Sequence, residues 1–213
     1  MADKYQDKYR ISTTRLQNWD YGWNALYFIT ICTKNREHYF GEIENDNMVL
    51  TNIGVIADVF WHEIKNHSQF VDLDAFIVMP NHIHGILTIN NPTHNSDFVG
   101  DTVETRHALS LTQSPQPPSS SQQPNIHLQS TDSIQTVGQK RFQNQGKNTL
   151  SSILGSYKSA VSKHAHRLGF EFEWQSRFYD HIIRDNSSFL RIQKYIETNV
   201  INWDSDKFND MIL

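Results

Sequence analysis

The stretch LDAFIVMPNHIHGILTI, residues 73–89, decides the fold of this chain. It holds two runs rich in β-branched and apolar residues, Leu73–Met79 and His82–Ile89, which the pair Pro80-Asn81 separates. Such runs are typical of β-strands, and a Pro-Asn pair is typical of the break between two strands. We therefore predict two successive strands over 73–79 and 82–89.

The residues before this stretch predict a strand, a hairpin and a helix. Asn24–Thr33, with the sequence NALYFITICT, is aromatic and β-branched, as strands are. Glu44-Asn-Asp lies between two short apolar segments, Tyr39–Ile43 and Asn47–Leu50, and indicates a hairpin. A helix is expected from Asn52 to about Asn66, because its apolar residues recur at helical spacing and Thr51 can cap its first turn.

Ordered structure is expected again from Thr149 onward. The apolar spacing predicts a helix to about Leu168, which Gly169 ends. Phe170–Trp174 alternates like a short strand, and a last helix is expected over Ser187–Asn199. No structure is predicted for 204–213. This order of elements predicts an α+β fold, an antiparallel sheet packed with helices.

A long segment between the two halves has a different composition. From Asn90 to Gly146 the chain is rich in Gln, Ser, Thr, Asn and Pro and has few bulky apolar residues. Such a segment cannot bury enough surface to offset the entropy lost on ordering. We predict one domain over 1–213 with a mostly disordered insertion over 90–146. An element that orders on DNA is the alternative.

Composition limits the class of protein. The apolar fraction of 38% is enough for one sizeable core, and the net charge of −4 argues against a generic nucleic-acid coat. However, residues 139–195 hold ten lysines and arginines against four carboxylates, which is compatible with a phosphate-binding face. The lone Cys32, the polar N-terminus and the lack of a long apolar run predict a soluble, cytoplasmic protein without a membrane span.

His82 and His84 are the first candidates for chemistry. Side chains alternate along a strand, so both imidazoles point to one face and can converge on a single divalent ion. A structural pair of histidines is the alternative. Cupins and several hydrolases use the same spacing, so the pair alone does not define a reaction.

Tyr195 and Asn199 are the second candidates, because residues four apart share one face of a helix. The amide of Asn199 offers a hard oxygen ligand, and two imidazoles with such a ligand suit Mg²⁺ or Mn²⁺ better than structural Zn²⁺. A tyrosine beside such an ion can attack a phosphorus atom and hold a DNA end covalently. The alternative for Tyr195 is a core aromatic.

A third segment, residues 174–184, mixes aromatic and basic side chains in a way that suits base stacking and phosphate contacts. A packed strand and turn with ordinary surface cations is the alternative. Tyr179 in this segment is a rival nucleophile, although it has no partner ligand one helical turn away. The residues that we predict to contact DNA are Trp174, Arg177, His181, Arg184 and, on the last helix, Lys194.

Four motifs in order resemble those of the single-tyrosine HUH transposases, especially the group called REP-associated tyrosine transposases. The four are YFITICTKNREHYFG, MPNHIHGIL, WQSRFYDHIIR and KYIETN followed by Trp203. The resemblance covers about Tyr9–Thr88 and Thr149–Trp203 and omits the insertion. It implies a ferredoxin- or RRM-like sheet with the His82–His84 strand at its centre.

The resemblance also implies an activity and roles for residues. Carried over by motif, His82, His84 and Asn199 are ligands of Mg²⁺ or Mn²⁺, and Tyr195 is the nucleophile. Members of the group cleave single-stranded DNA near palindromes that fold into hairpins, leaving a 5′-phosphotyrosine and a free 3′-OH. Rejoining follows when a 3′-OH attacks that linkage, so no external energy source is needed. Related transposases are dimers in many cases and monomers in others.

The chain departs from the group's pattern at the insertion and at Val200, where a proline is usual. Proline there would end the helix, whereas we expect valine to let it continue. Two other functions stay open: a domesticated module that binds hairpin DNA or RNA without cutting it, and a metal-dependent nuclease that uses an activated water.

Overall fold

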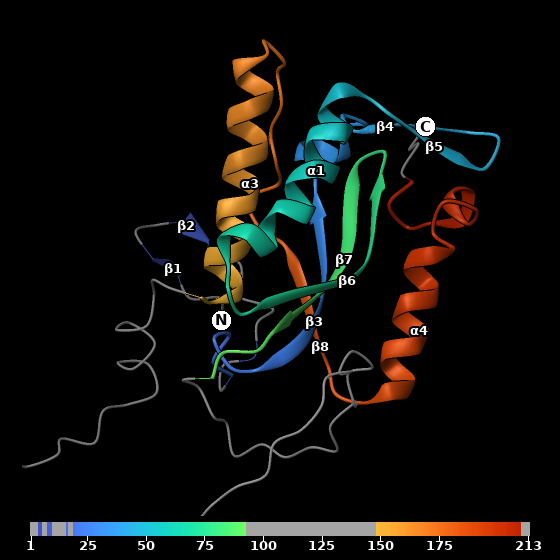
Figure 1. The fold of residues 1–213 in the computed structure, drawn as a ribbon. Helices are drawn as coiled ribbons and strands as arrows, with labels where there is room; N and C mark the ends of the chain where they lie inside the picture. Colours follow the sequence, from blue (N-terminus) through green and yellow to red (C-terminus); the bar gives the residue numbers. More distant parts are fainter. Residues whose placement is uncertain (1–3, 6–7, 10–15, 17–18, 93–147, 210–213) are drawn as a thin grey trace, which may run out of the picture.

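A four-stranded antiparallel sheet forms the centre of the molecule (Figure 1). The computed structural model describes residues 4–5, 8–9, 16, 19–92 and 148–209. The strand order is β6-β7-β3-β8. These strands span Ala25–Cys32 for β3, Val71–Met79 for β6, His82–Ile89 for β7 and Tyr179–Ile183 for β8. The prediction of an α+β fold with an antiparallel sheet is confirmed.

Strand β7, which carries both histidines, lies inside the sheet between β6 and β3. Its partner β3 is paired along its whole length, with Ala25 opposite Ile89 and Cys32 opposite His82. The pairing of β6 with β7 has a register irregularity between Leu73 and Phe76. The central position of the histidine strand, which the sequence resemblance implied, is therefore confirmed.

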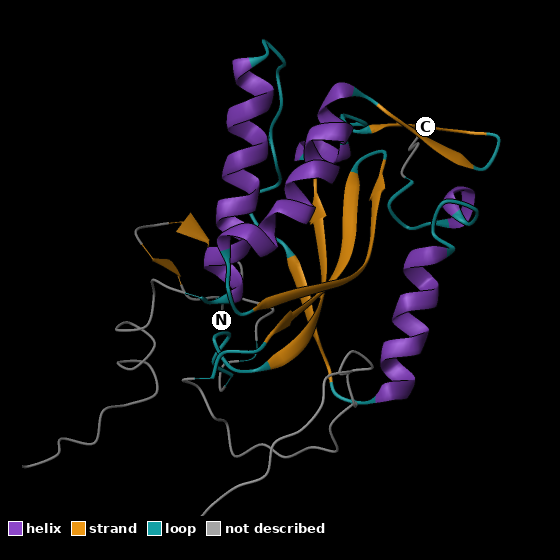
Figure 2. Cartoon of the chain, in the orientation of Figure 1, coloured by secondary structure: helices purple, strands orange, loops and turns teal. Residues whose placement is uncertain are grey.

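Helices cover the two faces of the sheet unequally. Helix α1 (Asn52–His67) and helix α3 (Leu150–Arg167) pack against each other over one face, and α4 (Asn186–Glu197) lies on the other (Figure 2). Each begins at a side chain that accepts a hydrogen bond from the first turn. These side chains belong to Thr51 in α1, Thr149 in α3 and Asp185 in α4.

The smaller elements are β1 (Lys4–Tyr5), β2 (Lys8–Tyr9), β4 (Gly41–Glu44), β5 (Asn47–Leu50) and the 3₁₀ turns η1 (Lys34–Arg36) and η2 (Trp203–Ser205).

The main core fills the space between the sheet and helices α1 and α3. Trp61 of α1 is fully buried in it and stacks on Phe76 with ring centroids 4.5 Å apart. The indole lies against Gly85 of β7, where an added Cβ would come within 2.3 Å of it. Gly85 therefore lets a large ring of α1 rest directly on the strand that carries the histidines.

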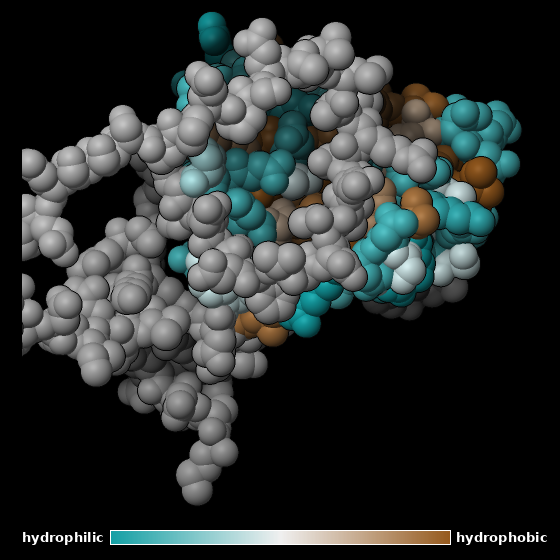
Figure 3. Space-filling view, turned by 60° about the horizontal axis from the view of Figure 1, so that its bottom comes forward, coloured by the Kyte–Doolittle hydropathy of each residue, from teal (hydrophilic) through white to brown (hydrophobic). Residues whose placement is uncertain are grey.

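A smaller core joins α4 to the opposite face of the sheet. Ile192 and Ile196 of α4 cluster with Ile86 of β7 and Ile183 of β8. On the coloured part of the face that Figure 3 shows, hydrophilic residues predominate, with hydrophobic patches among them. None of the helices in the described part of the chain combines the length and apolarity needed to cross a membrane.

Most elements that the sequence predicts are present, but the last strand was placed wrongly. Phe170–Trp174 is not a strand, and of its residues only Trp174 forms an isolated bridge, to Thr33. The fourth strand is instead Tyr179–Ile183. The aromatic alternation of 170–174 serves packing, because Phe172 is buried against the ring of Phe40. The predicted insertion over 90–146 lies outside the described residues, apart from 90–92.

Replacing either of two glycines by alanine is expected to change the free energy of unfolding, in opposite directions for the two sites. Gly85→Ala forces a Cβ into the indole of Trp61 and is expected to lower the free energy of unfolding by about 1–3 kcal/mol. Gly155 lies within α3, and no atom lies within 4 Å of a Cβ added there. Gly155→Ala is therefore expected to raise the free energy of unfolding by up to about 1 kcal/mol. Urea denaturation followed by circular dichroism measures both, and a neutral Gly85→Ala would contradict the packing described here.

Candidate active site

The imidazoles of His82 and His84 face each other on one side of β7. Their Nε2 atoms are 3.0 Å apart, and the side chains are 0% and 1% exposed. Alternation along the strand places Ile83, between them, in the main core on the other face. The structure thus brings together the two histidines that the sequence predicts to share a ligand.

Neighbouring side chains orient both rings through their Nδ1 atoms. His82 Nδ1 donates to Asn81 Oδ1 at 2.8 Å, since the amide nitrogen of Asn81 donates to the carbonyl of Phe208. His84 Nδ1 lies 2.8 Å from the hydroxyl of Thr30 on β3. Fixing one ring nitrogen in this way sets the direction in which the other points, as is usual for histidines that bind metals.

Burial keeps both histidines neutral. It lowers the pKa of His84 to about 4 and the pKa of His82 well below its usual value. For His82 the neighbouring His84 acts in the same direction, whereas for His84 the carboxylate of Asp206 opposes the shift. Neutral imidazoles have lone pairs available for a cation near pH 7.

Asp206 is a member of the site that the sequence did not predict. Atoms of His82, His84 and Asp206 that can bind a metal lie within 4.8 Å of one another. Asp206 follows the turn η2 and falls in the segment 204–213, for which no structure was predicted. The signal available in the sequence was a carboxylate seven positions after Asn199, the last predicted ligand.

Asn199 adjoins this group, although it lies beyond the helix. Helix α4 ends at Glu197, so the expectation that Val200 lets the helix continue is wrong. Thr198 is the C-cap of α4, and its backbone N–H donates to the carbonyls of Lys194 and Ile196. Asn199 Nδ2 donates to Asp206 Oδ2 at 2.9 Å, which joins the turn after α4 to the segment after η2.

The arrangement fits a divalent cation. Two nitrogens bound to one ion at about 2.1 Å and at right angles lie about 3.0 Å apart, and this is the separation of the two Nε2 atoms. Asn199 Oδ1 is buried and has no hydrogen-bond partner within the described part of the chain. A buried acceptor without a partner is costly, and a cation would satisfy it. His82, His84 and Asp206 are therefore a group that could hold a metal ion.

Tyr195 lies beside the histidines on α4. Its hydroxyl is 3.1 Å from His84 Nε2 and donates to Asp206 Oδ2 at 3.3 Å. Burial, followed by the Asp206 carboxylate, raises the pKa of the phenol to about 12, so it is protonated at neutral pH. The residue as a whole is nevertheless 37% exposed, so part of it can be reached from outside.

The segment after α4 covers the other side of the histidines. The ring of Phe208 lies 4.5 Å from the ring of His82, and that of Trp203 lies 6.0 Å from it. Two side chains hold the backbone of this segment in place. Arg36 donates to the carbonyl of Lys207, and Asn81 donates to the carbonyl of Phe208. Phe208 and Trp203 thus shield the pair, while Tyr195, a partly exposed residue, contacts it from α4.

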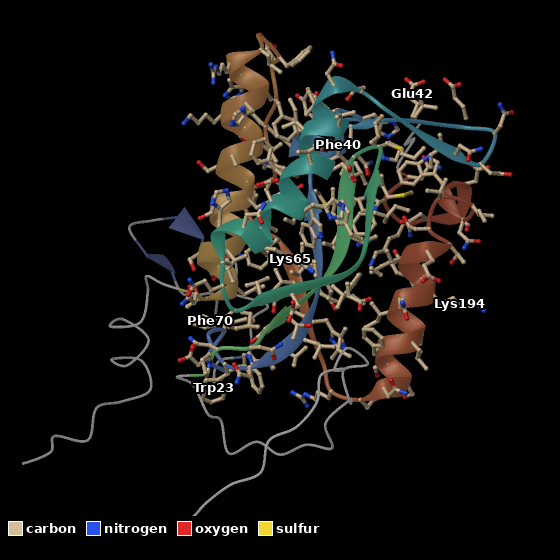
Figure 4. All side chains as sticks on the ribbon, viewed as in Figure 1. Trp23, Phe40, Glu42, Lys65, Phe70 and Lys194 are labelled. Carbon is tan, nitrogen blue, oxygen red and sulfur yellow. The ribbon has the colours of Figure 1, made fainter. Side chains whose placement is uncertain are left out.

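The predicted DNA contacts lie on three different elements. Arg177 is exposed in the loop before β8, and His181 is exposed on β8 itself. Arg184 follows β8 and lines, with His181, a cavity of about 400 Å³. Lys194 is exposed on α4 and points away from the sheet (Figure 4).

Trp174 occupies a different environment from the one expected. Its indole N–H donates to the carbonyl of Lys158, and its ring packs against Phe172 and Phe40 beside the main core. This packing is the alternative considered for the 174–184 segment, a packed structural element. A role for Trp174 in stacking on DNA bases stays a prediction.

The chain is similar to known proteins, among them the following two. A Haemophilus influenzae protein described as uncharacterized is 34% identical over 194 residues, which are 91% of this chain and 89% of that protein. The structure of a REP-associated tyrosine transposase bound to a REP hairpin matches with a TM-score of 0.51 and 17% identity, over 92% of this chain and 77% of that one. The latter likeness shows a shared fold. No family model matches the chain.

The buried histidines predict a loss of stability in mild acid. In the unfolded chain histidine has a pKa of about 6.5, while the folded pKa of His84 is about 4. Between these values the unfolded state binds more protons, so stability is full above about pH 6.5 and falls as the pH drops towards 4. The expected loss is roughly 3 kcal/mol. Urea denaturation in EDTA at several pH values measures it; a His84→Gln variant with an equal loss would contradict the assignment to His84.

The position of Asp206 in the site predicts that Asp206 and its neighbour Asp204 differ in their contribution to metal binding. Asp206→Ala is expected to weaken Mn²⁺ binding by roughly 10- to 100-fold, the order seen when residues around a metal site are removed. Asp204→Ala is the matched control, because Asp204 is exposed two residues earlier, and its variant should bind as the unaltered protein does. Isothermal titration with Mn²⁺ gives both affinities. Equal affinities would remove Asp206 from the site.

Proposed function

The chain belongs to one family with the Haemophilus influenzae protein and has the fold of a REP-associated tyrosine transposase, and from this premise we propose that it is itself a single-tyrosine transposase. It cleaves and rejoins single-stranded DNA near hairpin-forming palindromes through a covalent 5′-phosphotyrosine. The observation that carries the proposal is the position of the Tyr195 hydroxyl, 3.1 Å from His84 Nε2 and next to Asp206.

Cleavage requires the phenol to lose its proton as it attacks. With a pKa of about 12, Tyr195 needs a base within reach. Asp206 Oδ2, which already accepts the phenol's hydrogen bond, is the group placed to take the proton. The Tyr195 oxygen then forms a bond to phosphorus, the bond from phosphorus to the 3′ oxygen breaks, and that oxygen leaves as a 3′-OH after gaining a proton.

In this proposal His82, His84 and Asp206 hold the divalent ion. The buried Oδ1 of Asn199, which has no hydrogen-bond partner in the described part of the chain, would be a further ligand. Two imidazole nitrogens together with the oxygens of Asp206 and Asn199 suit Mn²⁺ or Mg²⁺ better than structural Zn²⁺. When bound, the ion supplies positive charge that stabilises the negative charge developing on the phosphate. The chain's own contribution is to keep the imidazoles neutral, oriented and largely dry.

The distribution of charge supports DNA as the partner in this proposal. Hairpin DNA with a single-stranded extension presents phosphates both in the stem and next to the cut. Arg177, His181, Arg184 and Lys194 are exposed cations or potential cations on three elements around the site, and such groups position nucleic acid through its backbone. Their contribution is expected to fall as the salt concentration rises.

Tyr195→Phe is expected to abolish the covalent protein–DNA adduct while hairpin binding changes by less than about twofold, because the ring stays and only the hydroxyl is lost. The assay incubates the protein with Mn²⁺ and labelled single-stranded DNA from the flanks of its own gene, followed by denaturing electrophoresis. A protease-sensitive shifted band marks the adduct.

Tyr179→Phe is the matched control for Tyr195→Phe, and it should keep the adduct. An adduct that persists in Tyr195→Phe and disappears in Tyr179→Phe would transfer the nucleophile to Tyr179. Cut DNA without an adduct in the unaltered protein would favour a nuclease that uses water. Binding without any cutting in Mn²⁺ or Mg²⁺ would favour a binding module.

A further inference from the structure

A row of side chains crosses the sheet from the histidines to its free edge. Thr30 of β3 is directly opposite His84 of β7 on one side and opposite Tyr179 of β8 on the other. Residues directly opposite one another on neighbouring strands point to the same face of a sheet. Tyr179 therefore lies on the face that carries the histidines, two strands away, or roughly 10 Å between backbones.

Aromatic rings connect Tyr179 to the nucleophile. Phe28 lies on this same face, two residues before Thr30, and its ring centroid is 6.2 Å from Tyr195 and 6.4 Å from Tyr179. Both contacts are edge-to-face, and the Phe28 ring also lies 5.2 Å from His84. The rings of Tyr195, Phe28 and Tyr179, which we call the aromatic row, lead from the site towards the edge of the sheet.

Helix α4 leaves the end of this row uncovered. Its main contacts are with β6 and β7, and on β8 it clusters with Ile183, at the other end of the strand from Tyr179. Tyr179 is 52% exposed, unlike Phe28, which is partly buried. An exposed aromatic ring on the open half of a sheet offers a flat face to a ligand with a ring of its own.

A cavity of about 400 Å³ lies beside Tyr179. Consecutive residues of β8, from Tyr179 to Ile182, line it, so it runs along the free edge of the strand. Arg184 and His181 add hydrogen-bond donors to its wall. The carboxylate of Asp185 also lines the cavity. It accepts hydrogen bonds from the backbone N–H of Ser188 and from the hydroxyls of Ser187 and Ser188 at the start of α4. An aromatic wall with donors that can reach ring acceptors suits a nucleobase.

We propose that Tyr179 is the stacking platform for a base next to the scissile phosphate, and that this base enters the cavity along β8. The proposal rests on the proposed function, because it takes Tyr195 as the point of attack. The separation between the histidines and Tyr179 is one that a dinucleotide can span. Tyr179 then acts through its ring by holding the strand in register with the nucleophile, and its hydroxyl is not needed.

The test measures binding of single-stranded DNA in EDTA, so that cleavage plays no part. The probe is a short fluorescein-labelled oligothymidylate, since stacking tolerates any base, and fluorescence anisotropy gives its affinity. Tyr179→Ala is expected to weaken binding roughly 5- to 100-fold, the range for loss of one stacked base. Tyr179→Phe and Tyr179→Trp keep the ring and should bind within about twofold of the unaltered protein.

Leu168→Ala is the matched control, because Leu168 is also an exposed large apolar residue but lies at the end of α3, on the opposite face of the sheet. It should not change the affinity. Unchanged binding by Tyr179→Ala, or an equal loss in Tyr179→Phe, would overturn the stacking role. Thermal melts of each variant report whether it is folded.

Failure of this proposal can be told apart from failure of the proposed function. If the unaltered protein forms the Mn²⁺-dependent adduct and Tyr179→Ala binds oligothymidylate normally, the strand transferase stands and the platform is overturned. If Tyr179→Ala loses binding and the unaltered protein forms no adduct, the platform is supported as a single-strand contact and its connection to cleavage by Tyr195 is overturned.

Discussion

The antiparallel pairing of β7 with β3 is the constraint on which the rest of the site depends. Its register places His84 opposite Thr30 and His82 opposite Cys32, so both imidazoles leave the sheet on one face and Ile83 enters the core on the other. A shift by one residue would exchange the two faces. The main core prevents such a shift, because Ile83, Leu87 and Ile89 are all fully buried in it.

The two faces of the sheet have different physical roles. On the core face, Gly85 allows Trp61 to lie directly on β7, which anchors the strand to α1. On the other face, α4 is held by a small apolar cluster that includes Ile192 and Ile196, and this cluster sets the position of Tyr195. Rigid packing on one side thus supports a polar site on the other, where the alignment of reacting groups matters most.

Burial gives the site its chemical character. It keeps the histidines neutral, and with Asp206 nearby it keeps the Tyr195 phenol protonated until a base removes the proton. The same environment leaves Asn199 Oδ1 without a partner, a cost that a bound cation would remove. In the proposed mode of DNA binding, the exposed ring of Tyr179 is reached without disturbing this buried group.

The sequence by itself determined the elements and the pair of histidines, because strand alternation, helical spacing and caps such as Thr51 and Thr149 are local properties. It also placed Tyr195 and Asn199 in one region of the chain. Only the tertiary structure decided that Tyr179–Ile183, rather than Phe170–Trp174, forms the fourth strand, because aromatic alternation fits a packed loop as well as a strand. Asp206 likewise joins the histidines through contacts between residues more than one hundred positions apart, which no local pattern records.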